Sequence, residues 1–301
     1  MKVVYSKNRT PAAPDSNVAD ILASVSSEKL RDYVEMLAFP RHYFAENRAN
    51  RRARDLLLET VTGFGYKPYL QGSFDNVVMT SPGPAGGPVL LLGAHYDSVA
   101  GTTGADDNAS AMAVCLECAR LIQLNTIGSV MIVFFNREED GLLGSGEFVA
   151  HLASQSALSI KEAHVFEMVG YCDRTPGSQK MPGGLPIIGP DVGDFLALLA
   201  NSNSNAIAEN LIDAAASYLP EFPVFALKIY LGMEKAFGDL NRSDHAPFWK
   251  AGIPSIMWTD TANFRNPHYH LASDTPDTLD YAFMAEVTKL ALARAVLQGG
   301  R

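Results

Sequence analysis

Cysteine is scarce in this chain, and the three that occur, Cys115, Cys118 and Cys172, cannot form an even set of disulfides. Cys115 and Cys118 have the spacing of a redox or zinc pair, but they fall inside a predicted helix and no second pair follows. We therefore expect these two thiols to be buried and inert. The scarcity of cysteine excludes a small scaffold held together by disulfides.

Long apolar runs are also absent. No run approaches the ~20 residues that a membrane-spanning helix needs, and residues 1–10 lack the apolar centre of a signal peptide. We expect no membrane partner. The chain as written is expected in the cytoplasm, or in a secreted or periplasmic form if a leader has been removed, so the compartment is left open.

Basic residues are outnumbered by acidic ones. The chain has 24 Lys and Arg against 33 Asp and Glu, and its formal net charge is −9 at pH 7. Because the acidic residues are spread over many segments, this balance argues against nucleic acid as a partner. The length of 301 residues and the hydrophobic fraction of 47% are typical of a globular enzyme with a sizeable core. The oligomeric state is left open.

Short apolar runs alternate with helical patterns along most of the chain, which predicts an α/β fold with a mainly parallel central sheet and helices on both faces. Residues 1–25 are polar and rich in Ala, Pro and Ser, and we expect a loose arm there, before a single domain at 26–301. Strands are predicted at 66–70, 76–80, 89–93, 129–135, 163–166 and 253–258, helices at 27–37, 47–61, 108–123, 145–152 and 279–297, helical pieces at 192–219, and a flap at 173–193.

Side chains that bind metals follow three of these predicted strands. His95 follows one strand, the pair Glu138–Glu139 the next and Glu167 the third, while Asp106–Asp107 lies in a loop that enters a helix. The carboxyl ends of parallel strands share one edge of a sheet, and ligands bind at that edge. Imidazole and carboxylate groups without thiolates suit zinc, manganese or cobalt in a hydrolytic site.

Each of these residues also has a simpler interpretation. A single His at a strand end is more often a hydrogen-bonded core residue, Asp at a helix start is more often an N-cap, and a Glu pair in a loop is usually solvated. The simpler interpretations must explain each residue separately, whereas a two-metal site uses them together. Asp97, two positions after His95, has the character of an acid that fixes the imidazole tautomer.

Four segments carry a family resemblance, and their order along the chain makes it specific. The segments are Gly93–Ser98 (GAHYDS), Gly104–Ser110 (GADDNAS), Glu138–Ser145 (EEDGLLGS), and Tyr269–His270 with Ser273–Thr275. Over residues 88–285 the chain resembles the M28 family of zinc exopeptidases. This resemblance implies a mixed sheet flanked by helices, and two zinc ions bridged by a carboxylate and a water.

The resemblance also assigns ligands position by position. Asp107 is chosen over Asp106 as the bridging acid, because the family places that acid immediately before the Asn-Ala-Ser segment. Similar enzymes have a cis peptide directly after it, which predicts one at Asp107–Asn108. The implied ligands are His95, Asp107 and Glu167 for one zinc, and Asp107, Glu139 and His270 for the other.

The remaining roles follow from the same resemblance. Glu138 would be the general base that takes a proton from the water and passes it to the leaving amine. Tyr269, directly before His270, is a candidate hydrogen-bond donor to the developing oxyanion, with a merely packed tyrosine as the alternative. His245 lies in a conspicuous SDHAPF segment. Because the resemblance places the ligand at His270, we interpret His245 as a residue that supports the ligands or faces the substrate.

One position departs from the family pattern, which usually has Asp where this chain has Glu167. The longer side chain would shift that metal, alter its occupancy or change the preferred ion. Two zinc ions are expected, with cobalt or manganese as alternatives.

The sequence as a whole predicts a metal-dependent exopeptidase, most simply an aminopeptidase that acts on a peptide or a small aminoacyl substrate. Residues 173–193 and 264–266 are expected to line its pocket, and the preferred side chain is left open. A glutaminyl-cyclase-like acyltransferase with a single zinc is the alternative. A noncatalytic binding module is a further alternative, which the intact Glu138–Glu139 pair disfavours.

Overall fold

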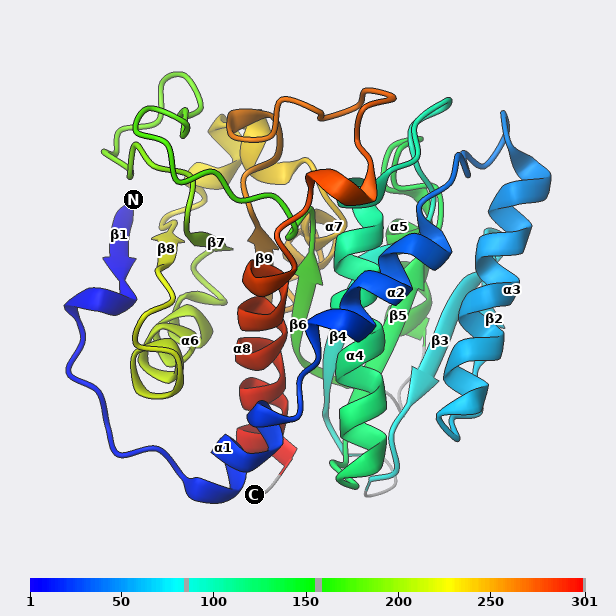
Figure 1. Ribbon diagram of the computed structural model, residues 1–301, viewed down its shortest axis with the longest axis horizontal. Helices are drawn as coiled ribbons and strands as arrows, with labels where there is room; N and C mark the ends of the chain where they lie inside the picture. Colours follow the sequence, from blue (N-terminus) through cyan, green and yellow to red (C-terminus); the bar gives the residue numbers. More distant parts are fainter. Residues whose placement is uncertain (84–86, 155–158, 300–301) are drawn as a thin grey trace.

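The computed structural model describes residues 1–83, 87–154 and 159–299. Within these residues nine strands form one sheet in the order β1-β8-β7-β9-β6-β4-β5-β3-β2 (Figure 1). The strands are β1 (Lys2–Tyr5), β2 (Tyr69–Gln71), β3 (Asn76–Thr80), β4 (Val89–His95), β5 (Val130–Phe135), β6 (Ile160–Phe166), β7 (Leu196–Ala200), β8 (Val224–Lys228) and β9 (Ser255–Thr259).

Helices connect most of the strands. The longer ones are α1 (Ser16–Ala23), α2 (Ser27–Leu37), α3 (Asn47–Gly63), α4 (Ala111–Leu124), α5 (Leu143–Ser154), α6 (Asn205–Tyr218), α7 (His245–Lys250) and α8 (Tyr281–Gly299). The shorter turns are η1 (Ser6–Asn8), η2 (Ala105–Ser110), η3 (Met233–Ala236), η4 (Gly238–Asn241), η5 (Ala262–Phe264) and η6 (Pro276–Thr278). No helix among the described residues is both long enough and apolar enough to cross a bilayer.

The centre of the sheet is parallel and its flanks are mixed. Strands β9, β6, β4 and β5 pair in parallel, while β3 joins β5 and β7 joins β9 in antiparallel fashion. Every residue of β4 is buried, as expected of a strand that is covered on both faces. The predicted fold class, a mixed and mainly parallel central sheet with helices on both faces, is confirmed.

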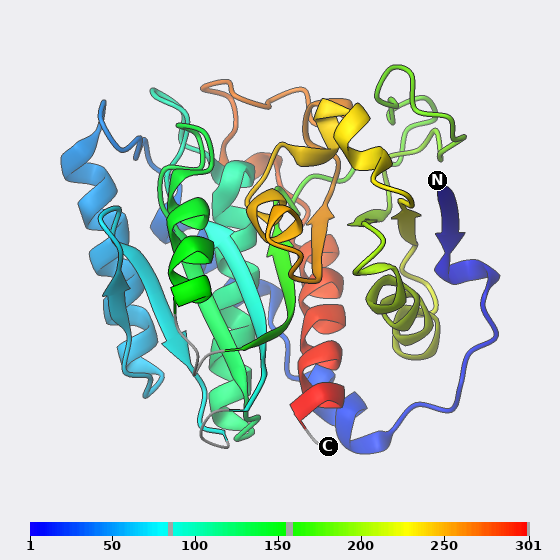
Figure 2. The same ribbon diagram turned by 180° about the vertical axis from the view of Figure 1, so that it is seen from behind.

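Alternate residues of β4 face two separate helical layers, because successive side chains of a strand point to opposite sides. Leu90 and Leu92 belong to the larger core, which also takes in side chains of α1, α2, α3, α4, α6 and α8. Leu91 packs instead with Phe148 of α5 and Phe248 of α7. Figure 1 shows α2, α4 and α8 in front of the sheet, and Figure 2 shows α5 (green) and α7 (orange) on the opposite face.

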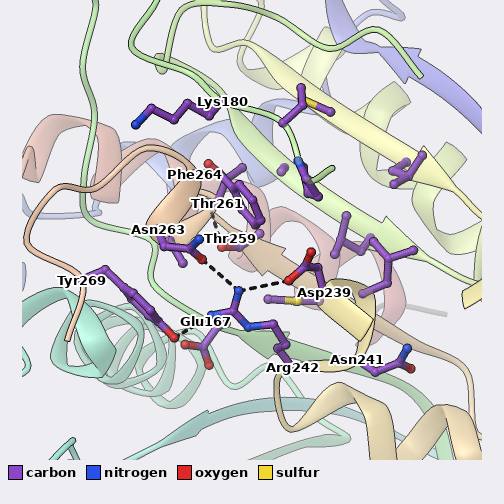
Figure 3. Close-up of a pocket in the computed structure, with 18 of the residues that line it drawn as sticks. Glu167, Lys180, Asp239, Asn241, Arg242, Thr259, Thr261, Asn263, Phe264 and Tyr269 are labelled. Carbon is purple, nitrogen blue, oxygen red and sulfur yellow. Dashed lines mark hydrogen bonds and ion pairs between the residues drawn. The ribbon is translucent and has the colours of Figure 1, made fainter. Parts of the chain in front are cut away.

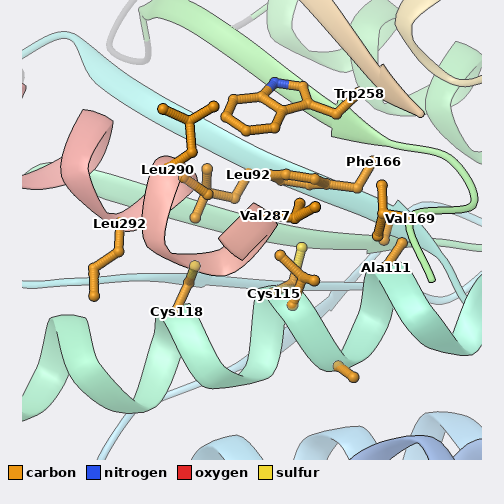
Figure 4. Packing of buried hydrophobic residues seen from close by; sticks show 14 of the residues in the cluster. Leu92, Ala111, Cys115, Cys118, Phe166, Val169, Trp258, Val287, Leu290 and Leu292 are labelled. Carbon is orange, nitrogen blue, oxygen red and sulfur yellow. The ribbon is translucent and has the colours of Figure 1, made fainter. Parts of the chain in front are cut away.

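The cysteines lie where the sequence predicts. Cys115 and Cys118 on α4 are fully buried, and Figure 4 places them among Val287 and Leu290 of α8 and the neighbouring strand residues. Burial raises the pKa of both thiols, so they stay protonated and inert. Their role is to fill the helix–sheet interface.

The first 25 residues correct the expectation of a loose arm. Strand β1 pairs antiparallel with β8 and adds an edge to the sheet. The Asp15 carboxylate then accepts the backbone N–H groups of Asn17 and Val18 and caps α1, which contributes Val18, Ile21 and Leu22 to the core. A polar composition did not reveal these elements, because β1 gains its hydrogen bonds from a strand more than 200 residues away.

Residues 192–219 require a second correction. They contain the strand β7 followed by α6, where helical pieces were expected throughout, and β8, which the sequence did not predict, comes next. The run Leu196–Ala200 is apolar at every position, and periodicity cannot distinguish a buried strand from a buried helix in such a run. Pairing with β8 on one side and β9 on the other decides in favour of a strand.

A buried charged network ties the sheet to α8. Arg294 donates to both oxygens of Glu162, at 2.7 and 2.6 Å. Trp258 donates to Nδ1 of His164 at 3.1 Å, so the His164 proton lies on Nε2, which is 3.2 Å from Glu162. Burial by itself raises the pKa of Glu162, but the hydrogen bonds from His164 and Arg294 outweigh it and lower the pKa to about 2.

We predict that Glu162→Gln lowers the free energy of unfolding by about 3–5 kcal/mol at neutral pH, because it leaves the buried Arg294 charge without its partner. The contribution of ionised Glu162 is complete above the ordinary carboxyl pKa of about 4.3. It is lost as the pH falls toward the folded-state pKa of about 2, so the difference between the two proteins should narrow in acid.

Urea denaturation at several pH values measures both effects. Glu35→Gln is the matched control, because Glu35 forms an exposed pair with Arg31 at 4.0 Å and its loss should change stability by less than about 0.5 kcal/mol. Equal stability of the Glu162→Gln and Glu35→Gln proteins at neutral pH would contradict the proposed contribution of the buried network to the free energy of unfolding.

Candidate metal centre

The loops that follow the parallel strands lie together along one edge of the sheet, the upper edge in Figure 1. Strand β4 is flanked by β5 on one side and by β6 on the other, so the chain leaves β4 in one direction and returns on the opposite side. Such a switch point opens a crevice beyond the carboxyl end of the strand. His95 is the last residue of β4 and stands at this crevice.

The first group of candidate ligands gathers around His95. Its Nε2 atom lies 3.3 Å from Oδ1 of Asp107 and 3.4 Å from Oε2 of Glu167. All three side chains are buried. The end of β4, the turn η2 and the residue that follows β6 therefore bring together the three residues that the resemblance assigns to one metal.

The second group shares Asp107 with the first. The His270 Nε2 atom lies 3.2 Å from Oδ2 of Asp107 and 3.7 Å from Oε2 of Glu139. Each oxygen of Asp107 thus faces a different histidine, which is the arrangement that a bridging carboxylate requires. His270 comes from the loop between β9 and α8, far along the chain from the strand ends that carry the other ligands.

The neighbouring acid, Asp106, has a different environment. Its oxygens accept the backbone N–H of Gly170 at 2.9 Å and the side-chain amide of Asn266 at 2.6 Å. Burial raises the pKa of Asp106 well above its ordinary value. The peptide bond between Asp107 and Asn108 is cis, as the resemblance predicts. Asp106 is therefore bound by Gly170 and Asn266, whereas Asp107 faces His95 and His270.

The residues present fit a metal. His95 Nε2, Asp107 Oδ1 and Glu139 Oε1 are buried polar atoms with no hydrogen-bond partner among the described residues. Each belongs to a candidate ligand, and each lies in one of the groups whose donor atoms are within 4.8 Å of one another. Two imidazoles and three carboxylates form the donor set, which suits zinc, cobalt or manganese.

Asp97 holds both the histidine and the glutamate pair. The hydrogen-bond partner of His95 Nδ1 is the backbone carbonyl of Asp97, at 3.2 Å, and the carboxylate Oδ1 of Asp97 lies 3.4 Å from the same nitrogen. The two oxygens of this carboxylate also accept the backbone N–H groups of Glu138 and Glu139, each at 3.2 Å. One buried carboxylate therefore fixes the start of the loop that carries the base and the ligand.

Arg137 anchors the same loop from outside. Its guanidinium lies over the rings of Tyr43, Phe44 and Phe74, at 4.8, 4.5 and 4.9 Å, and donates to Asp140 at 3.0 Å. The aromatic residues belong to the segments before and after α3. This contact fixes the residue that directly precedes Glu138.

The environment of Glu138 favours proton uptake. Burial raises the pKa of its carboxyl group well above the ordinary value, and the charges of Glu167 and Asp244 raise it further, against a lowering by His95. Glu138 is absent from the two ligand groups that contain Asp107, although it lies close to His95 and Glu139. A carboxylate with a raised pKa beside the candidate ligands is suited to act as a base.

Glu167, the position that departs from the family pattern, is held by a serine. Ser243 Oγ donates to Oε2 of Glu167 at 2.7 Å and is itself fully buried. The hydrogen bond fixes the longer side chain so that its carboxylate reaches His95. Sequence analysis did not single out Ser243, although it begins the conspicuous SDHAPF segment.

Two further residues that sequence analysis missed hold the loop of the bridging acid. The buried guanidinium of Arg41 donates to the backbone carbonyls of Tyr96, Thr103 and Gly104. Asp274 accepts the backbone N–H groups of Asp106 and Asp107, at 2.8 and 3.1 Å. Asp274 lies in the SDT segment that carries part of the family resemblance, so the sequence contained a signal for it. Arg41 lies in no such segment, and the sequence contained no signal for its role.

Tyr269 lines the candidate site beside His270. Its ring stacks on that of His270, with centroids 3.7 Å apart and an interplanar angle of 23°. Its hydroxyl accepts a hydrogen bond of 2.7 Å from Arg242. Burial raises the pKa of this hydroxyl, so it stays protonated and can donate a hydrogen bond in turn.

A cavity of about 350 Å³ adjoins these residues, and Figure 3 shows part of its lining. Glu138, Glu139, Glu167, Tyr269 and His270 border it on one side. The far wall is largely apolar and includes Phe195, Leu199 of β7, Phe225 and Leu227 of β8, Met257 of β9 and Phe264. Residues 179–182 of the predicted flap, Leu185 and Ile187 also contribute to the lining.

The structure places His245 away from the cavity. It is fully buried at the start of α7, where its Nε2 donates to the Leu240 carbonyl at 2.9 Å and its ring packs edge-on against Trp249. Burial lowers its pKa to about 4, so the ring is neutral. It joins none of the candidate ligand groups and lies outside the cavity lining, because its hydrogen bond turns it toward η4.

Comparison with known proteins gives concordant results. The model of peptidase family M28 matches residues 76–295. The chain is 35% identical to the uncharacterized protein YfbL of Escherichia coli, over 86% of this chain and 84% of that protein. It is 28% identical to a probable leucine aminopeptidase of Arthroderma otae, over 96% of this chain and 76% of that protein.

Two solved structures illustrate the fold. The LapA aminopeptidase of Legionella pneumophila superimposes with a TM-score of 0.76 at 19% identity, over 98% of this chain and 78% of that one. A Bacteroides thetaiotaomicron glutaminyl cyclase superimposes with a TM-score of 0.67 at 17% identity, over 90% of this chain and 98% of that one. Since the family model covers most of the chain and includes all of the candidate ligands, this protein belongs to peptidase family M28, a family of hydrolases.

Proposed function

We propose that this protein is an aminopeptidase that uses two zinc ions, with His95, Asp107 and Glu167 as ligands of one and Asp107, Glu139 and His270 as ligands of the other. The observation that carries the proposal is the position of Asp107, whose two oxygens face two different histidines at 3.3 and 3.2 Å. Zinc held by these residues would polarise the substrate carbonyl and make hydroxide available near neutral pH.

Glu138 is the proposed general base. It accepts the proton of the attacking water and returns it to the amine that leaves. Its backbone is fixed by Asp97, so the carboxylate is held at the wall of the cavity while the proton moves. Tyr269 donates a hydrogen bond to the carbonyl oxygen as negative charge develops on it.

The cavity is the proposed site of the N-terminal side chain of the substrate. Its apolar far wall favours a bulky apolar residue, and the carboxylates of Glu138, Glu139 and Glu167 on its other side favour the positively charged amine. A relative that carries the name probable leucine aminopeptidase supports the same substrate class. The likeness to glutaminyl cyclases lies at the level of the fold, and nothing in the geometry favours that activity over peptide hydrolysis.

We predict that Glu138→Gln keeps the metals but lowers kcat by about 10²–10⁴-fold, because the amide cannot accept the proton. Hydrolysis of leucyl-4-nitroanilide, with metal content measured on the same samples, gives the result. Glu35→Gln, an exposed change on α2, should retain full activity. Near-normal turnover of the Glu138→Gln protein would refute the assigned base.

Metal stoichiometry provides an independent test. The wild-type chain, dialysed against chelator and reconstituted with zinc, should regain activity and bind two ions. His270→Ala should lose one of them, whereas Asp107→Ala should lose most of both, because only Asp107 contributes to the two sites. A single ion in the wild type, with turnover of N-terminal glutaminyl peptides, would favour the acyltransferase instead.

A further inference from the structure

We propose that Arg242 is a positioning residue, which holds the Tyr269 hydroxyl so that its proton points at the reacting carbonyl group. The inference rests on the proposed function, because it concerns how the same site stabilises the developing charge. Arg242 directly follows η4 and lines the cavity beside Tyr269 and His270. Nothing in its sequence context pointed to this role.

The hydrogen-bond chemistry of the pair fixes the direction of the tyrosine proton. A guanidinium can only donate, so the Tyr269 oxygen is the acceptor in the 2.7 Å contact with Nη2. The hydroxyl proton is then free to be donated elsewhere. A hydroxyl that accepts from a cation is also a stronger donor, because hydrogen bonds in a chain polarise one another.

Arg242 is itself held in place on its other side. Its Nη1 atom donates to Asn263 Oδ1 at 2.9 Å and lies 3.3 Å from Asp239 Oδ1. Figure 3 shows the guanidinium between these two side chains and the Tyr269 hydroxyl. The residue thus links η4 to the loop after β9, two segments that border the cavity from different sides.

The ring of Tyr269 is restrained from a second direction. It stacks on His270 with centroids 3.7 Å apart, and the Arg242 guanidinium lies 5.5 Å from its centroid. His270 fixes the plane of the ring, and Arg242 fixes the oxygen at its tip. A tyrosine with only a packing role would not need its hydroxyl held by a cation at the edge of the cavity.

A different role for Arg242 would be direct binding of a carboxylate on the substrate. The structure favours positioning, because both acceptors at Nη1 and the one at Nη2 come from the protein itself. The two roles make different predictions for substrates with and without a free carboxylate, so the experiment includes both kinds.

The test is a double-mutant cycle on the zinc-loaded protein. Tyr269→Phe should lower kcat for leucyl-4-nitroanilide by about 10²-fold, the typical effect of losing one oxyanion donor. Arg242→Met should lower it by about 10-fold with KM changed less than about 2-fold, and should add almost nothing in the Tyr269→Phe background. Arg242→Lys should recover part of the loss, because an ammonium group also donates to the hydroxyl.

A binding measurement supplies a readout that does not depend on turnover. Calorimetry with a tetrahedral leucine phosphonate should show weaker binding to the Arg242→Met and Tyr269→Phe proteins, by similar factors, with leucine itself bound as tightly as by the wild type. Arg31→Met is the matched control. Arg31 likewise lies over a tyrosine ring, 4.1 Å from the centroid of Tyr281, but neither Arg31 nor Tyr281 lines the cavity. This substitution should leave kcat and phosphonate affinity unchanged.

Three outcomes would overturn the inference. Additive losses in the double variant would mean that Arg242 acts without Tyr269. A rise in KM confined to dipeptides with a free carboxylate would assign Arg242 to substrate binding. A wild-type protein that neither hydrolyses nor binds aminoacyl compounds would remove the proposed function and this inference together, whereas the first two outcomes leave the proposed function intact.

Discussion

The carboxylate of Asp107 faces His95 through one oxygen and His270 through the other, and the geometry of the whole site depends on this contact. His95 ends a central strand, whereas His270 lies in a long loop before the last helix. The two can meet only because the parallel core puts the loops after β4 and β9 on the same edge. Arg41 and Asp274 then hold the backbone around the bridging acid from both sides.

The site concentrates negative charge where water is largely excluded, and the surrounding chain compensates for that charge. Several kcal/mol per ion is the usual cost of burying a charge without partners. Backbone N–H groups satisfy Asp97 and Asp274, and Ser243 satisfies one oxygen of Glu167. Three of the ten buried polar side-chain atoms without partners among the described residues belong to the candidate ligands His95, Asp107 and Glu139.

The two halves of the sheet contribute different kinds of side chain to the cavity. On one side of β9, the strands β6, β4 and β5 lead into Glu167, His95 and the Glu138–Glu139 pair. The strands on its other side, β7 and β8, supply apolar side chains such as Leu199, Phe225 and Leu227 to the cavity wall. These are the strands that sequence patterns did not reveal. Chemistry and specificity therefore come from parts of the chain that differ in how well sequence alone describes them.

The sequence by itself determined the class of fold and the candidate ligands at the strand ends, because both follow from local patterns, whereas the choice of Asp107 and His270 came from the family resemblance. Buried parallel strands read as short apolar runs, and His95, Glu138–Glu139 and Glu167 stand directly where those runs end. Only the tertiary structure decided what depends on distant partners: β1 as an edge strand, β7 as a strand, His245 turned toward Leu240, and Ser243 and Arg242 beside the site. The physical reason is that each of these features is fixed by a contact between segments well separated along the chain or by the way a loop folds back, and a local pattern carries no record of either.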